Sequence, residues 1–290
     1  MRMVFLACAL LSVITTVGIV LVLIFDTVSF FQEIPVFSFL FGTNWSPLIR
    51  PFSFGVLPLV SSTLTFTLVT GAVALPLGLL AAIYLSEYAP GRVRAVVKPA
   101  LEVLAGIPTV VYGYFALVYL TPALRHIFPR IATFNVLSAG IVVGIMIIPT
   151  VASISEDAMR AVPKTLRYAA YGLGATKFQV TRTVVIPASL SGTMSSFILG
   201  ISRAIGETMA VTIAAGGLPR MISFLKPAEA FLQPIQTMTA AMVEIGIGDV
   251  SGDSVAYKSL FAVGMVLFLM TFALNVVSDR IKSRYREKYE

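Results

Sequence analysis

Long apolar runs, separated by short charged segments, make up most of this chain. A helix needs about 20 predominantly apolar residues to cross ~30 Å of hydrocarbon. Stretches free of Asp, Glu, Lys and Arg predict six such helices, whereas the alternation typical of a membrane β-barrel is weak. The predicted spans are 3–25, 57–85, 101–121, 136–155, 190–215 and 259–279. The pattern therefore predicts an all-α integral membrane protein with six transmembrane helices.

A shorter uncharged stretch, residues 34–49, contains Pro35, Trp45 and Pro47, which favours a loop at the membrane interface. The first span has 23 uncharged residues. The apolar core of a signal peptide is shorter, with about 7–15 residues. We therefore expect it to remain as an uncleaved first helix.

The composition supports a membrane protein. Hydrophobic residues make up 57% and charged residues 12%, against about 45–50% and about 25% in soluble domains. These values exclude a disordered chain, a collagen and a coiled coil. The net charge of +7 does not predict nucleic-acid binding, because the basic residues are dispersed between apolar runs. We expect membrane lipids as neighbours instead.

The distribution of basic residues predicts the orientation. An even number of spans places both termini on one side of the membrane. If that side is the cytoplasm, fourteen Lys and Arg residues lie inside and six lie outside, with Arg203 within a span. The positive-inside rule therefore predicts cytoplasmic termini.

The cytoplasmic connection 156–189 carries more helix formers than a passive linker needs. Pro163 suits the start of a helix, and Gly172 and Gly174 suit its end. We expect a short helix–turn–helix against the inner face of the membrane. Four residues of this connection are predicted to form an apolar face: Ala169, Ala170, Leu173 and Ala175.

Two charges interrupt the fifth predicted span. Arg203 and Glu207 are four residues apart, so in one continuous helix they share a face. A helix from 188 to 215 would place Arg203 near its middle, where a charge costs several kcal/mol unless it is paired or hydrated. Two interpretations stay open. Arg203 could line an anion pathway, with Glu207 moderating its charge, or the two could form a structural ion pair.

The sequence contains no motif for chemistry of its own. Gly172–Lys177 has two glycines and a lysine, but no G-x-x-x-x-G-K-[ST] pattern is present. No metal-ligand cluster, paired carboxylates or nucleophilic triad is visible, and the single Cys8 permits no internal disulfide. We therefore expect no catalytic residue, no metal and no cofactor. An energy source would lie on another polypeptide.

The connection 156–189 resembles the coupling loop of ABC importer permeases, with the pattern EAA, three residues, Gly, nine residues and I-x-L-P. Here Ala169-Ala170 precede Gly174, and Val184–Pro187 follows at the expected distance. Tyr168 stands where the pattern has Glu. This resemblance implies that eight residues contact an ATPase: Leu166, Tyr168, Ala169, Ala170, Gly172, Gly174, Ala175 and Thr176.

Further segments narrow the resemblance. Ser202–Ala210 is similar to the R-A-x-G-E-T segment of phosphate ABC permeases, and residues 99–113 resemble a second segment of that group. Trp45–Pro47 and Phe54-Gly55 look like the C-type subunit. The resemblance implies a type I ABC importer permease fold with a cytoplasmic coupling helix, and phosphate import across the bacterial inner membrane, with Arg203 and Glu207 in the substrate pathway.

The family also implies partners and a division of the chain. The partners are a second, related permease subunit, a pair of cytoplasmic ATPases and an external phosphate-binding protein; no nucleic acid is expected. We divide the chain into a first helix with its outer loop (1–56), a permease core (57–280) and a C-terminal tail (281–290). A permease for molybdate or sulfate and a non-transporting scaffold or sensor remain alternatives. A secondary transporter would need an inverted repeat, which is not visible.

Overall fold

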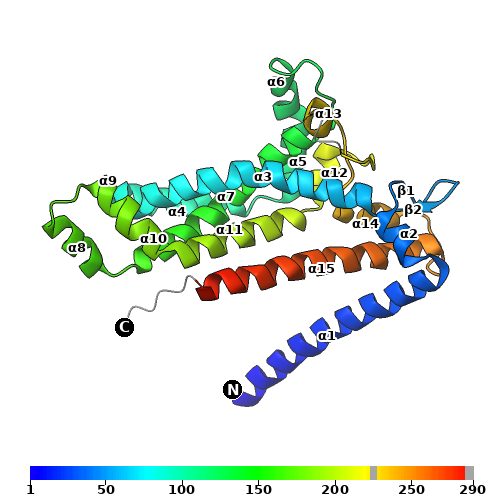
Figure 1. The fold of residues 1–290 in the computed structure, drawn as a ribbon, viewed down its shortest axis with the longest axis horizontal. Coiled ribbons are helices and arrows are strands. Elements are labelled where there is room, and N and C mark those ends of the chain that lie inside the picture. Colours follow the sequence, from blue (N-terminus) through cyan, green and yellow to red (C-terminus); the bar gives the residue numbers. More distant parts are fainter. Residues whose placement is uncertain (223–226, 285–290) are drawn as a thin grey trace.

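The computed structural model describes residues 1–222 and 227–284, which are mostly helical (Figure 1). Six helices have 15 or more residues: α1 (Arg2–Glu33), α3 (Leu57–Ile83), α4 (Gly91–Ala105), α7 (Val136–Ala161), α11 (Leu190–Ile205) and α15 (Val255–Arg284), counted within the described residues. The shorter α-helices are α2 (Val36–Phe41), α5 (Thr109–Phe115), α6 (Thr121–Arg125), α8 (Lys164–Gly172), α9 (Lys177–Val180), α10 (Ile186–Ala188), α12 (Met209–Ala215), α13 (Pro227–Leu232) and α14 (Met238–Ile247).

Two other kinds of element complete the described chain. The π-helical turns are η1 (Tyr84–Tyr88), η2 (Ala116–Leu120) and η3 (Thr181–Val185). Strands β1 (Trp45–Ser46) and β2 (Ser53–Phe54) pair antiparallel, with Trp45 opposite Phe54. Trp45 is buried beside Phe30 and Phe39, so the uncharged stretch 34–49 folds into a packed cap.

Four of the predicted spans are single helices that are long and apolar enough to cross a membrane. They are α1, α3 with η1, α7 and α15. Each extends beyond its predicted span, and charged residues such as Glu33, Glu87 and Arg160 lie in the added turns. Of the predicted tail 281–290, residues 281–284 continue α15 and residues 285–290 lie outside the described part of the chain.

The third predicted span, 101–121, is wrong as a continuous helix. Gly91–Ala105 and Thr109–Arg125 are bent by 89° at the intervening residues. Pro108 lacks an N–H and disfavours helical backbone at Ile107, which explains the break. The Tyr112 hydroxyl donates to the Leu104 carbonyl across it, at 2.8 Å.

The fifth predicted span, 190–215, is also wrong. α11 ends at Ile205, and α12 begins only at Met209. Instead, Lys177–Ala188 and Leu190–Ile205 form a pair bent by 70°. The described chain therefore has four unbroken candidate spans, or six if each bent pair is one span.

α3 and α7 pack closely against each other along their lengths. A Cβ added at Gly140 of α7 would lie 2.5 Å from Val69 Cγ1, and one at Gly144 would lie 2.8 Å from Val73 Cβ. The G-x-x-x-G spacing places both glycines on one face, so the backbones approach closely. This contact lies beside the main buried cluster, which includes Phe66.

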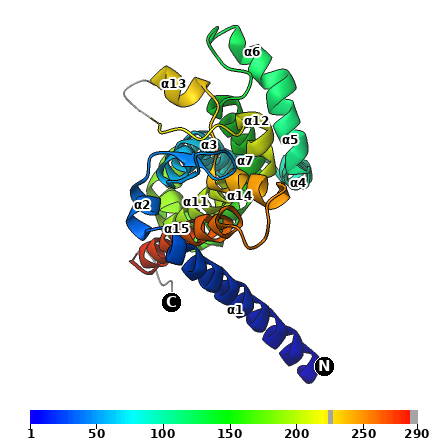
Figure 2. The ribbon, with the colours of Figure 1, turned by 90° about the vertical axis from the view of Figure 1, so that its right-hand side faces the viewer.

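The elements are arranged along one long axis. α3, α7, α11 and α15 lie roughly along it, whereas α1 diverges from the bundle in both views (Figures 1 and 2). α8 and α9 lie at one end, and the β1–β2 hairpin and α14 lie at the other. The first residue of α1 and the last residues of α15 both point away from the hairpin end, as an even number of crossings requires.

Candidate functional site: a broken helix and a coupling loop

Arg203 lies in the last turn of α11, and not near the middle of a helix as predicted. Its side chain is exposed, and its Nη1 donates a long hydrogen bond, 3.4 Å, to Thr150 Oγ1 of α7. The phenol of Tyr112 from α5 is close enough to interact with the positive charge of Arg203. Residues from three helices, α11, α7 and α5, therefore lie close to this cation.

Glu207 lies in the break between α11 and α12, so the predicted shared helix face with Arg203 is wrong. Residue Glu207 is 8% exposed, and its Oε1 accepts the Ala210 N–H at 3.3 Å. Its carbonyl accepts a hydrogen bond from Thr239 Oγ1 at 2.8 Å. Among the described residues Arg203 forms no ion pair. A structural Arg203–Glu207 pair is therefore not present in this conformation.

The segments beyond the two breaks pack on each other. A Cβ at Gly113 of α5 would lie 3.1 Å from Ala210 Cα and 3.0 Å from Ile213 Cβ, both in α12. Gly113 therefore allows α5 and α12 to touch through their backbones. The break before α5 and the break before α12 are brought to the same region of the fold.

Small residues of α11 face the neighbouring helix α7. Ser196 of α11 lies 2.6 Å from the Ser155 hydroxyl of α7, and both are buried. Gly200 approaches Val151 and Ile147. The small residues of α11 thus build the contact with α7, and Arg203 extends beyond it.

The predicted helix–turn–helix is confirmed in the connection 156–189. α8 begins directly after Pro163 and ends at Gly172. Gly174 has a φ of +84°, in the left-handed region that favours glycine. Thr176 then begins α9 through a reciprocal capping box with Gln179.

The predicted apolar face is only partly correct. Ala170 and Ala175 pack against a buried cluster that contains Met159 and Val180. Leu173, by contrast, is 90% exposed. Ala169 is exposed too, and further exposed side chains extend this outer surface: Leu166, Tyr168, Tyr171 and Phe178.

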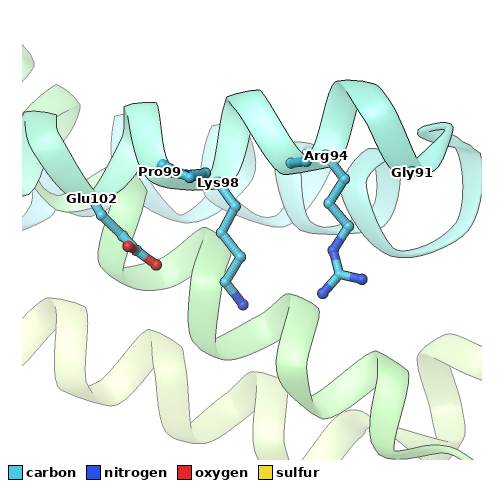
Figure 3. Close-up of a pocket in the computed structure, with 6 residues that line it drawn as sticks. Gly91, Arg94, Lys98, Pro99 and Glu102 are labelled. Carbon is cyan, nitrogen blue, oxygen red and sulfur yellow. The ribbon is translucent and has the colours of Figure 1, made fainter.

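Sequence reasoning missed a buried carboxylate near the C-terminal end of α7. Glu156 is 0% exposed and lies 2.6 Å from Arg94 Nη2 and 2.9 Å from Lys98 Nζ of α4. Figure 3 shows Arg94, Lys98 and Glu102 projecting from one side of α4 toward the neighbouring helix. A buried charge is retained only with such partners. Glu156 is far from Arg94 and Lys98 in the sequence, so no local pattern of residues indicated this contact.

A second missed contact joins the coupling loop to the rest of the fold. Arg167 of α8 forms an ion pair with Glu87 of η1, 3.0 Å apart. In the sequence Arg167 contributes only to the count of basic residues, and Glu87 only ends an uncharged run. No spacing rule relates two residues that are 80 positions apart.

Known proteins resemble this chain over most of its length. The family model for the binding-protein-dependent transport system inner membrane component matches residues 74–287. The probable ABC transporter permease protein YqgH of Bacillus subtilis is 33% identical, over 98% of this chain and 90% of that protein. The phosphate transport system permease protein PstC of Mesorhizobium japonicum is 34% identical, over 83% of this chain and 77% of that protein.

Two solved structures share the fold. A chain of the inward-facing MetNI methionine ABC transporter superposes with a TM-score of 0.58 at 19% identity, covering 80% of this chain and 97% of that chain. A chain of a bacterial importer of the polysaccharide alginate gives a TM-score of 0.56 at 12% identity, covering 96% and 99%. The expected type I importer permease fold is confirmed.

Proposed function

Because the chain belongs to the family of binding-protein-dependent transport system inner membrane components, we propose that it is a permease subunit of an ATP-driven importer of inorganic phosphate. The identity of 34% to a phosphate transport permease over most of the chain supports the substrate class. It is a multi-pass protein of the bacterial inner membrane, and the excess of basic residues in the inner loops favours cytoplasmic termini.

The exposed guanidinium of Arg203 is the observation that carries this proposal. It stands at a helix break without a carboxylate partner among the described residues. A guanidinium stays charged and presents a planar fork of donors that matches two oxygens of a phosphate. One donor is directed to Thr150, so others are free for an anion. Arg203 would attract the anion, and the carboxylate of Glu207, across the helix break, would moderate the positive charge so that the anion can leave.

The energy for import would come from partners. The chain has no nucleotide motif, so a pair of cytoplasmic ATPases would bind the exposed surface of α8 and the turn after it. A second, related permease subunit would complete the pathway, and an external binding protein would deliver the anion. The exposed residues we propose to contact the ATPases are Leu166, Tyr168, Ala169, Gly172, Gly174 and Thr176. Ala170 and Ala175 pack against the cluster of Met159 and Val180, so they would support this surface from below.

Anion selectivity tests the proposal directly. The importer, assembled from this chain and its partner subunits, is placed in cells that lack other phosphate importers. Uptake of radiolabelled phosphate is measured with excess unlabelled sulfate or molybdate. We expect uptake that depends on this chain and resists both competitors. Uptake of sulfate or molybdate in place of phosphate would assign another oxyanion, and an assembled complex that transports no oxyanion would indicate a scaffold.

A further inference from the structure

Two contacts join the coupling loop to η1, the π-helical end of α3. On one side, Arg167 Nη2 of α8 lies 3.0 Å from Glu87 Oε1. On the other side, Lys177 Nζ of α9 lies 4.9 Å from the centre of the Tyr88 ring. Glu87 and Tyr88 are adjacent, so both helices of the loop hold the same turn.

The Arg167 contact is sheltered from water. Its side chain is 15% exposed, and that of Glu87 is 7% exposed. An ion pair in this setting is screened much less than a surface pair. Removal of either partner would leave a charge with little solvation.

Arg167 also binds the end of α7. Its Nη1 donates to the Val162 carbonyl at 2.9 Å, and its Nη2 donates to the Met159 carbonyl at 2.8 Å. The last carbonyls of a helix lack intrahelical donors and carry partial negative charge, so a cation is favoured there. One guanidinium therefore connects α8, α7 and η1.

This connection leads to the proposed anion site through a single helix. Met159 and Thr150 are both in α7, and Thr150 accepts the hydrogen bond from Arg203. α7 also packs closely against α3 at Gly140 and Gly144. A force applied to Arg167 would therefore act on α3 and α7 together, because their backbones are in contact.

We infer that Arg167 is a positioning residue that transmits the movement of the coupling loop to α3 and α7, with Lys177 and Tyr88 as the second contact. The inference rests on the proposed importer function. Lysine cannot replace Arg167, because one ammonium cannot span the three acceptors that two guanidinium nitrogens reach. π-helical turns are frequent at functional sites, which agrees with η1 as the element that receives the movement.

The test compares transport with ATP hydrolysis in proteoliposomes that contain the whole importer. For Arg167→Lys we expect a normal amount of complex and continued ATP hydrolysis, with about tenfold less phosphate imported per ATP. Arg182→Lys is the matched control, since Arg182 is exposed on η3 of the same loop. It should retain the normal ratio. An unchanged ratio in Arg167→Lys would overturn the inference.

A second variant covers the case in which Arg167→Lys reduces the amount of complex. Glu87→Gln removes the charge but keeps an oxygen that accepts from Arg167, so the complex should assemble. A reduced import per ATP supports the inference, and a normal ratio overturns it. Failure of the proposed function would look different, because the unmodified importer itself would not carry phosphate.

A distance measurement makes the test independent of the substrate. Spin labels on Thr165 of α8 and Leu80 of α3, both exposed, report the separation of loop and bundle after Cys8 is replaced by serine. We expect a narrow distance distribution, equal with and without ATP, in the assembled importer. Arg167→Lys should broaden it. The same narrow distribution in Arg167→Lys would contradict the inference.

Discussion

The guanidinium of Arg203 donates a hydrogen bond to the Thr150 hydroxyl of α7, 3.4 Å away. This contact fixes the side chain between two helices without neutralising its charge. Glu207, the obvious candidate partner in the sequence, instead accepts the backbone N–H of Ala210 beyond the helix break. The cation is therefore available to an anion, and the carboxylate shapes the backbone that follows.

The first prediction concerns the charge of Arg203. Arg203→Gln should reduce phosphate uptake about tenfold to hundredfold, as expected for the loss of a charge-assisted contact of roughly 1.5–3 kcal/mol. Arg203→Lys should keep part of the uptake, because the charge remains and the planar fork is lost. The amount of assembled complex should not change, since no carboxylate loses its ion-pair partner. Radiolabelled uptake is measured beside the amount of complex.

The double variant Arg203→Gln with Glu207→Gln is the control for this prediction. A structural ion pair would predict recovery of assembly and uptake when both charges are removed together. In the described part of the structure Arg203 and Glu207 form no ion pair, so we expect the double variant to assemble but still fail to import phosphate. Near-normal uptake by the double variant would remove Arg203 from the anion pathway.

The second prediction concerns the turn at Gly174. Its φ of +84° makes any other residue strained, although a Cβ there would meet nothing within 4 Å. Gly174→Ala should therefore cost only about 1–2 kcal/mol of local stability, whereas Gly174→Asp adds a charge to the proposed ATPase contact and should abolish import. Gly172→Ala, which has the same open surroundings without a positive φ, is the control. Normal import by Gly174→Asp would contradict the ATPase assignment.

A third prediction concerns Tyr168, whose side chain is exposed on α8. Because two thirds of the side chain is exposed, at 66%, Tyr168→Glu should fold normally. It restores the carboxylate of the coupling-loop pattern, so import should be retained. Complete loss of import with an intact complex would mean that the ATPase contact of this protein is built around the tyrosine.

The orientation in the membrane gives a fourth prediction. A cysteine at position 177, introduced after replacement of Cys8, should react with a membrane-impermeant thiol reagent only when the cytoplasmic face is accessible. The reason is the fourteen-to-six distribution of basic residues. Inside-out vesicles and intact cells are compared. Labelling in intact cells would reverse the orientation.

A fifth prediction addresses the contact between α3 and α7. Gly140→Val places side-chain atoms where Val69 already lies, since even a Cβ would come within 2.5 Å of it. The helices must separate, so we expect a severe loss of folded protein in detergent. Gly18→Val on α1, where a Cβ meets nothing within 4 Å, should have little effect. Equal amounts of both variants would show that the close approach is not needed.

The sequence by itself determined the features that depend on neighbouring residues. Uncharged runs predicted the apolar helices, because burial in hydrocarbon requires a continuous apolar segment. Pro163 and Gly174 marked the start of α8 and the turn after it, because proline and glycine act on the backbone where they stand. The spacing of the loop and the Arg203 segment also indicated the family.

Only the tertiary structure decided where the spans break and which charges meet. An apolar run cannot distinguish one helix from two, so 101–121 and 190–215 were predicted as continuous. Arg203 and Glu207 are neighbours on an ideal helix, but the break after Ile205 separates them. Arg167 and Glu87 are far apart in the chain and lie 3.0 Å apart in the fold. Such contacts depend on how whole helices pack, and no local pattern of residues predicts that packing.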